Sequence, residues 1–328
     1  MPKAKSLFLA AVSLLVAQMG SAAFAQDGAN QPPAHTKPFP SLATGENRQD
    51  VIEGYELAPQ LRRGIPAREL LEQRRRLDAS LARLEPQRPG VVDAFVVTIA
   101  LDSDPVFARE AREAARVLSR RYDAGGRTLT LAGPDGTRDD LPRGSIESLL
   151  VGLARVAELM DGSEDVLVLY TTSHGLNLGL AYHYGDVGYG ILSPNRLREA
   201  LAELGIERRI LVISACYSGV FVPELASADT AILTASAATR NSFGCEAEND
   251  WTFYGDALIN RAMREPVSLA EVAARANRTV AGWESQRRLL ASLPQSSIGA
   301  NVVNWLPQLE ARMPQVASQP VGRPAIAE

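Results

Sequence analysis

The feature that most constrains the fold is a series of short apolar, β-branched runs separated by segments with helical periodicity. Such runs are typical of strands that are covered on both faces. We predict strands within residues 91–101, 128–131, 166–170, 210–213 and 231–234. We predict helices at residues 106–121, 146–160, 195–204, 252–264 and 269–288. This alternation predicts an α/β fold, with a mostly parallel sheet and helices on both of its faces.

The first 25 residues have the pattern of a secretory signal peptide. Lys3 and Lys5 precede an apolar stretch at residues 7–16, and the triplet at residues 23–25 is Ala-Phe-Ala. The apolar stretch is shorter than the roughly 20 residues that a membrane-spanning helix needs. We therefore expect an exported protein, periplasmic or secreted, that keeps no membrane span after signal removal.

The remaining chain divides by composition. Residues 26–65 are rich in Pro, Asn, Gln and Gly, which predicts a disordered leader. The leucine spacing within residues 66–89 predicts an amphipathic helix and a connector. Residues 90–312 hold the predicted α/β domain, and residues 313–328, with three prolines, are predicted to be a disordered tail.

Charge and metal-ligand content exclude several classes of function. The chain has 34 Lys and Arg against 38 Asp and Glu, so it lacks the basic excess that nucleic-acid binding needs. Two cysteines and three histidines exclude a disulfide-stapled scaffold and a zinc site with four thiolates. We expect a peptide or protein substrate, no nucleic-acid partner, and neither a metal nor an organic cofactor.

Two predicted strands run directly into reactive side chains. The strand at 166–170 leads to His174, and the strand at 210–213 leads to Cys216. In an open α/β sheet ligands bind at the carboxyl ends of the strands, so the two side chains meet if the strands are neighbours. An imidazole can deprotonate the thiol and later protonate a leaving amine. The backbone N–H groups of Gly175 and Cys216 are candidates for an oxyanion hole, and Gly175 lets a substrate carbonyl approach closely. On spacing alone, a small buried cysteine and a structural histidine explain the pattern equally well.

The motifs together resemble the legumain-like cysteine peptidases, whose clan also contains caspases and gingipains. The resemblance rests on two motifs. In the first, a predicted strand is followed by Ser-His-Gly at 173–175, and in the second, a predicted strand is followed by Ala-Cys-x-Ser-Gly at 215–219. A third block, at 234–236, 241–245 and 254–256, looks like the family's segment that walls the specificity pocket. The resemblance spans about residues 91–283. It implies a caspase-like fold, with His174 as general base and Cys216 as the nucleophile that forms a thioester.

The same resemblance implies a pocket for the residue before the scissile bond, made of Arg109, Ser242 and Asp256. A guanidinium and a carboxylate suit an asparagine amide, which offers one acceptor and one donor group. Two positions depart from the family. Ser214 replaces a glutamate two residues before the nucleophile, which affects the expected substrate preference. Phe107 replaces an asparagine near the histidine, so another group, such as a backbone carbonyl, must orient the imidazole.

Cys245 coincides with a cysteine that is often seen in the pocket segment of this family. We interpret it as a free, structural thiol, because a disulfide to Cys216 would block the nucleophile even in an oxidising compartment.

The leading hypothesis is an endopeptidase that cleaves after Asn, or less readily after Asp. A transpeptidase or ligase with the same dyad is the first alternative, and a non-catalytic caspase-like binding module is the second. A metal site of His174, His183 and Cys216 is the weakest alternative, because His183 lies in a predicted strand or hairpin. A serine hydrolase of the α/β type is excluded by the missing Gly-x-Ser-x-Gly motif.

Overall fold

The computed structural model describes residues 47–57, 59–134 and 138–326. The chain divides into two units, Met1–Ser41 and Leu42–Glu328, and every described residue belongs to the second. The predicted signal peptide and most of the predicted leader lie outside the described residues.

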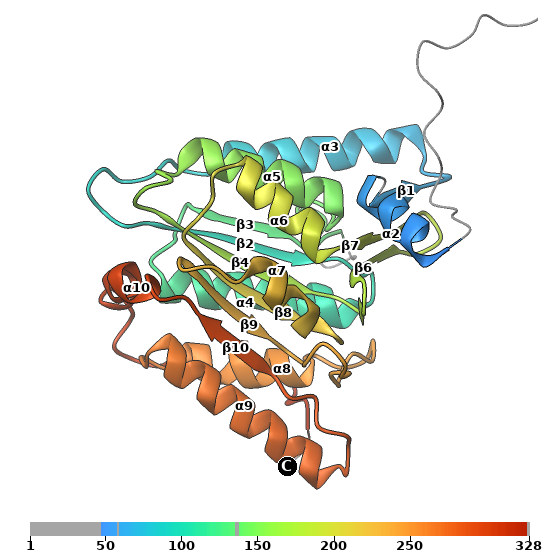
Figure 1. The fold of residues 1–328 in the computed structure, drawn as a ribbon. Coiled ribbons are helices and arrows are strands. Elements are labelled where there is room, and N and C mark those ends of the chain that lie inside the picture. The colour runs from blue at the N-terminus through green and yellow to red at the C-terminus, as the bar shows by residue number, and fades with distance from the viewer. Residues whose placement is uncertain (1–46, 58, 135–137, 327–328) are drawn as a thin grey trace, which may run out of the picture. The chain divides into compact units, whose positions relative to one another are not determined.

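A six-stranded sheet forms the centre of this unit (Figure 1). Its strand order is β10-β9-β8-β4-β2-β3, and all neighbours are parallel except β10, which runs antiparallel to β9. The strands are β2 (Ala94–Ala100), β3 (Thr128–Leu131), β4 (Val166–Thr172), β8 (Arg209–Ser214), β9 (Thr230–Thr234) and β10 (Gln295–Ile298). All five predicted strands are present, and the mostly parallel α/β class is confirmed. The exposed edge strand β10 was not predicted, because its Gln-Ser-Ser-Ile sequence is polar.

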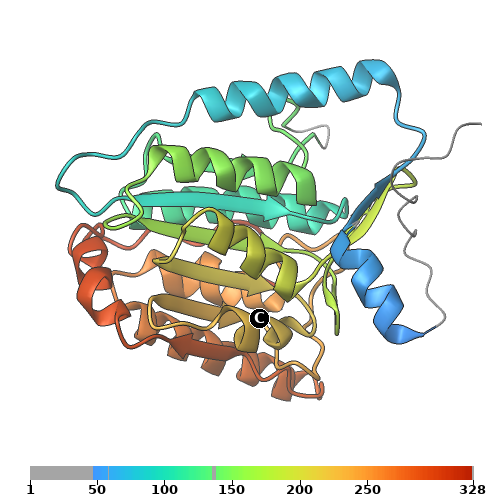
Figure 2. The same cartoon turned by 45° about the horizontal axis from the view of Figure 1, so that its top comes forward.

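Helices cover both faces of the sheet (Figure 2). One face carries α5 (Ile146–Leu159), α6 (Pro194–Glu203) and α7 (Phe221–Leu225), with α3 (Ala67–Ala82) packed beyond α5. The opposite face carries α4 (Pro105–Arg121), α9 (Leu269–Gln286) and α10 (Val302–Glu310). The helix predicted at 252–264 is broken into α8 (Phe253–Gly255), the π-helical η3 (Asp256–Arg261) and the 3-10 turn η4 (Ala262–Arg264).

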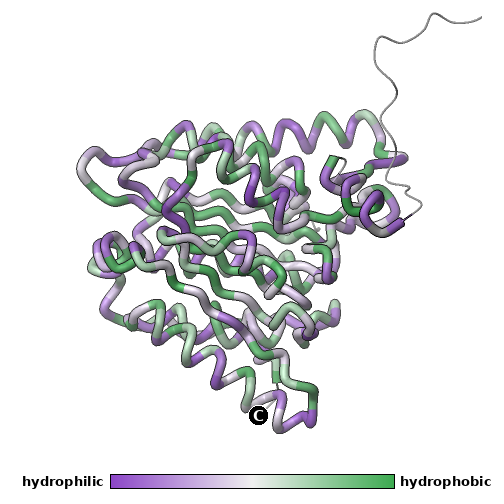
Figure 3. Tube along the Cα trace, in the orientation of Figure 1, coloured by the Kyte–Doolittle hydropathy of each residue, from purple (hydrophilic) through white to green (hydrophobic). Residues whose placement is uncertain are grey.

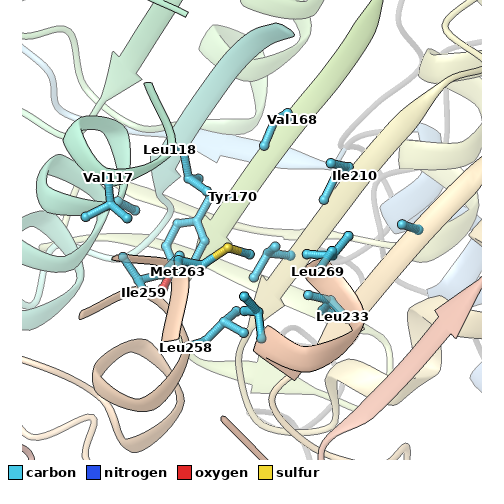
Figure 4. Close-up of a cluster of buried hydrophobic side chains, with 14 of the residues drawn as sticks. Val117, Leu118, Val168, Tyr170, Ile210, Leu233, Leu258, Ile259, Met263 and Leu269 are labelled. Carbon is cyan, nitrogen blue, oxygen red and sulfur yellow. The ribbon is translucent and has the colours of Figure 1, made fainter. Parts of the chain in front are cut away.

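Alternate side chains of each strand belong to different cores. In β2, Ala94 and Val96 pack with α4 and α9, whereas Phe95 and Val97 pack with α5. Both sets are fully buried, which explains why the strands are apolar throughout and not alternating (Figure 3). Tyr170 of β4 lies among side chains of α4 and of the η3–η4 segment (Figure 4).

A smaller antiparallel sheet, ordered β1-β7-β6-β5, adjoins the ends of the main strands. Its strands are β1 (Gln60–Arg62), β5 (Gly175–Leu176), β6 (Gly179–Tyr184) and β7 (Gly188–Leu192). Helix α2 (Arg48–Leu57) and β1 fall within the segment predicted to be a disordered leader, and that prediction differs from the structure over residues 48–57 and 60–62. Backbone pairing with β7 gives β1 an order that composition does not reveal.

The predicted disordered tail also differs from the structure. Asn260 and Trp251 donate side-chain hydrogen bonds to the Val321 carbonyl at 3.1 and 2.8 Å. The Ala325 N–H donates to the Asp256 carboxylate at 2.9 Å, and Ile326 is buried. The prolines therefore stop helix formation in residues 313–326 without preventing this segment from packing.

Within the described residues, no helix is both long and apolar enough to cross a bilayer.

Candidate active site

The parallel pairing of β4 and β8 brings the two predicted reactive residues to the same edge of the sheet. Thr172 pairs with Ser214, and His174 and Cys216 each follow two residues later. The backbone continues this register for one more residue, because the Ser173 N–H donates to the Ser214 carbonyl at 3.3 Å. The expectation that the two strands are neighbours is confirmed.

Gly175 lies directly against the backbone of Cys216. A Cβ atom at position 175 would lie 1.9 Å from the Cys216 carbonyl oxygen and 3.0 Å from its nitrogen. Any other residue would therefore push the two loops apart. The sequence predicted the need for glycine for a different reason, the approach of a substrate carbonyl.

The loop after β8 presents the Cys216 thiol, which is half-buried. The Ser242 N–H donates to its sulfur at 3.2 Å, and the Ser242 hydroxyl lies 3.6 Å from it. The next residue, Tyr217, has a left-handed backbone with φ of 56°, so the chain turns sharply at the cysteine. Position 219 also requires glycine, because a Cβ atom there would lie 2.4 Å from the Ala238 nitrogen.

A carboxylate lies next to the imidazole of His174. Asp104 Oδ2 is 3.3 Å from His174 Nε2, and Phe107 meets the ring edge-on at a centroid distance of 5.0 Å. Asp104 is the N-cap residue of α4, yet its side chain makes no capping hydrogen bond. Sequence reasoning missed this residue and proposed a backbone carbonyl for the same task. The only signal was an aspartate just before Pro105 at a predicted helix start.

A second aspartate, Asp102, contacts both Asp104 and His183. The Asp104 N–H donates to Asp102 Oδ1 at 2.9 Å, and Asp102 Oδ2 lies 3.4 Å from His183 Nδ1. Among the described residues, Asp102, Asp104 and His174 offer ligand atoms within 4.8 Å of one another, the spacing that a metal ion would need. His183 interacts with Asp102, so this cluster differs from the metal site of His174, His183 and Cys216 that was the weakest alternative from the sequence.

Only part of the predicted specificity pocket is supported. Ser242 lies at the thiol, as described above. Asp256 is fully buried, and its carboxylate accepts hydrogen bonds from Asn260 at 2.8 Å, Arg261 at 3.3 Å and the Ala325 N–H. These donors occupy the carboxylate, so Asp256 is not available to a substrate side chain.

A different aspartate accompanies Arg109. Asp250 Oδ1 lies 3.6 Å from Arg109 Nε, and both side chains are partly exposed. The Arg109 guanidinium also donates to the carbonyls of Ala247 and Asn249, so it fixes the loop that follows Ser242. The sequence motif did not reveal that Asp256 is fully buried.

Cys245 is a free thiol in the structure, as is Cys216. It packs against a small cluster that includes Phe107 and Ala111. Burial, followed by the nearby Cys216 and Glu246, raises the pKa of Cys245 to about 11. The thiol therefore stays protonated at neutral pH, and it is a poor nucleophile.

A cavity of about 230 Å³ adjoins the first turn of α4, beside the site. Its lining includes Asp102, Pro105 and Ala108 on one side and Arg143 and Tyr184 on the other.

A thiol and an imidazole at the ends of adjacent parallel strands, in a helix-covered α/β sheet, define a candidate cysteine hydrolase. Residues 144–303 match the model of the Peptidase C13 family, the legumain-like family that the motifs of this chain resemble. The match includes His174, Cys216 and Ser242 but begins after α4. This match supports a cysteine peptidase.

No curated protein matches the chain. Among solved structures, caspase-1 from Spodoptera frugiperda is similar at 14% identity and a TM-score of 0.42, covering 66% of this chain and 88% of the caspase.

Proposed function

We propose that this protein is an exported cysteine endopeptidase that cleaves peptide bonds after Asn, and less readily after Asp. The observation that carries the proposal is the register of β4 and β8, in which paired Thr172 and Ser214 each precede a reactive residue by two positions. The transpeptidase alternative uses the same residues and differs only in what attacks the acyl-enzyme.

The proposed reaction has two acyl-transfer steps. His174 takes the thiol proton, and the Cys216 sulfur attacks the scissile carbonyl carbon, whose oxygen becomes an oxyanion. The N–H groups of Gly175 and Cys216 donate to that oxyanion. Collapse of the intermediate breaks the C–N bond, and the imidazolium gives its proton to the leaving amine. Water, deprotonated by His174, then attacks the thioester and releases the new carboxyl end and the thiol.

Asp104 gives the imidazole a fixed orientation in this scheme. With His174 Nε2–H donating to Asp104, the nitrogen that accepts the thiol proton is Nδ1. The carboxylate also stabilises the imidazolium that forms during the reaction.

We assign the substrate side-chain pocket to Arg109, Ser242 and Asp250, in place of the buried Asp256. The guanidinium can donate to the amide oxygen of an asparagine, and the carboxylate can accept from its NH2 group. An ionised aspartate in the substrate would face Asp250, which disfavours it until one carboxyl is protonated.

The test is a fluorogenic peptide panel that varies the residue before the cleaved bond, with and without reductant. Peptides with Asn are expected to be cleaved fastest, and alkylation or Cys216→Ala is expected to abolish cleavage. His174→Ala tests the base in the same assay. Full cleavage after alkylation would exclude the mechanism, and absence of cleavage by the intact protein would favour the non-catalytic binding module. An added amine nucleophile that appears in the products would identify a transpeptidase.

Export is part of the proposal and rests on the sequence of residues 1–25. The mature chain is expected to begin at Gln26. Mass spectrometry of the amino terminus, on protein from the periplasm or medium, tests this, and an intact Met1 on the active protein would contradict it.

A further inference from the structure

Glu110 of α4 is a charged residue that the proposed mechanism does not use, and it is fully buried. Its carboxylate accepts three hydrogen bonds at Oε1 and two at Oε2. The donors at Oε1 are the hydroxyls of Tyr170, Thr172 (2.8 Å) and Ser214 (3.1 Å). The donors at Oε2 are the backbone N–H (2.9 Å) and the hydroxyl (2.8 Å) of Thr252.

These donors come from three separate parts of the chain. Tyr170 and Thr172 belong to β4, Ser214 ends β8, and Thr252 precedes α8. Thr172 and Ser214 are the paired residues that lie two positions before His174 and Cys216. One carboxylate thus joins both strands at the point where each leads to a reactive side chain.

The partners of Glu110 are all neutral. Within the part of the chain that the structure describes, no Arg or Lys pairs with this carboxylate, so hydrogen bonds alone offset its burial. A buried carboxylate is tolerated when several donors point at it, and bonds to an ionised acceptor are stronger than neutral ones. Burial, together with the adjacent Glu110, raises the pKa of Tyr170 well above its ordinary value, so the phenol remains a donor.

Gly255 shows that the chain makes room for this group. A Cβ atom at position 255 would lie 1.9 Å from Glu110 Oε2. The Gly255 N–H also donates to the Thr252 hydroxyl at 2.9 Å, which directs that hydroxyl's proton toward Glu110.

We propose that Glu110 is a positioning residue that holds the carboxyl ends of β4 and β8 in register, so that the imidazole of His174 meets the thiol of Cys216. This proposal rests on the proposed function. Glu110 does not touch the substrate; it acts through Thr172 and Ser214. A misplacement of about 1 Å between reacting groups can lower a rate by about 100-fold, so small shifts of the strand ends would be costly.

Glu110→Gln tests the proposal, because it keeps the size of the side chain and replaces one acceptor oxygen by a donor NH2. We expect kcat to fall about 10- to 100-fold while KM changes less than about threefold. Iodoacetamide should also label Cys216 more slowly than in the wild type, approaching the rate in His174→Ala.

Glu113→Gln is the matched control. Glu113 lies one turn further along α4, is also buried, and pairs with Arg264 at 2.8 Å and with Arg116. Its loss should lower the unfolding temperature but leave kcat and Cys216 labelling unchanged. Equal losses of kcat or labelling rate in the two variants would show that Glu110 is only structural, and it would overturn the proposal.

Ser214→Ala keeps the proposal testable if Glu110→Gln fails to fold. It removes one donor and leaves Glu110 with four hydrogen bonds, so the fold should persist with a smaller loss of kcat. An unchanged kcat and labelling rate in Ser214→Ala would contradict the proposal. If the wild type cleaves no peptide, the proposed function fails, and the Cys216 labelling rates still decide the role of Glu110.

Discussion

At the residue scale, Asp104 is an N-cap residue whose side chain contacts a distant histidine and not its own helix. An aspartate at a helix N-cap usually accepts from the first turn of its helix, but here the carboxylate turns to His174. Asp104→Asn should therefore lower kcat on the order of tenfold, since the imidazolium loses a counter-charge that is only partly screened by water.

The stability of Asp104→Asn separates this effect from a structural one. Because the side chain does not cap α4, the unfolding temperature should stay within about 2 °C of the wild type. A large loss of stability with an unchanged kcat would show that Asp104 is a helix cap after all.

The two cysteines should differ sharply in reactivity. With a pKa of about 11, Cys245 has roughly one thiolate in 10⁴ molecules at pH 7, and this fraction rises as the pH approaches 11. Iodoacetamide at pH 7 should label Cys216 alone, and Cys245 should react only at high pH. Peptide mass mapping across a pH series checks this, and equal labelling at pH 7 would show that burial does not suppress the reactivity of Cys245.

Asp250 and Asp256 provide the sharpest test of the corrected pocket. Asp250→Asn should reduce the preference for Asn over other residues in the peptide panel, because it removes the acceptor beside Arg109. Asp256→Asn should instead lower the free energy of unfolding by about 1–3 kcal/mol, since it places an NH2 group against buried donors, and it should leave the preference unchanged. The reverse result would restore the original assignment.

The sequence predicted those site residues that sit at strand ends. His174 and Cys216 follow apolar runs directly, so the parallel-sheet rule was enough to place them at the same edge of the sheet. Asp104 is 70 residues from His174, and Glu110 is 104 residues from Ser214, so only the packing of α4 reveals these contacts. Asp256 was misassigned because a motif gives residue order but not burial.

At the scale of elements, periodicity located the buried strands and the long helices well. Periodicity did not locate the elements whose structure depends on backbone hydrogen bonding and not on side-chain burial. Strands β1 and β10 are short, polar edge strands held by pairing with β7 and β9. The change from α- to π-helix at Asp256 leaves no mark in the apolar pattern of residues 252–264.

The carboxyl-terminal segment, residues 313–326, offers a test at this scale. Asn260 accepts from the Val321 N–H at 2.9 Å and donates to the Val321 carbonyl. Asn260→Ala should remove both bonds and cost about 1–3 kcal/mol in stability. It should also expose the segment to limited proteolysis, for which Gln308→Ala, at an exposed position of α10, is the control. Unchanged cleavage after Asn260→Ala would show that other contacts hold the segment.

At the scale of the whole molecule, the site is assembled from two parts of the chain. The segment that matches the peptidase family, residues 144–303, supplies the thiol, the imidazole and Ser242. Helix α4 and its N-cap residue, which precede it, supply Asp104, Arg109 and Glu110, each of which contacts a different part of that segment. A core shared by α4, β4 and the η3–η4 segment keeps the two parts together.

The cavity beside the first turn of α4 offers a binding place for a small molecule next to this two-part site. A small molecule bound between Pro105 and Arg143 would contact the first turn of α4, next to the Asp104 carboxylate that lies beside His174. Such a compound would not need to react with the Cys216 thiol, and inhibition kinetics at increasing peptide concentration would show whether it competes with the substrate.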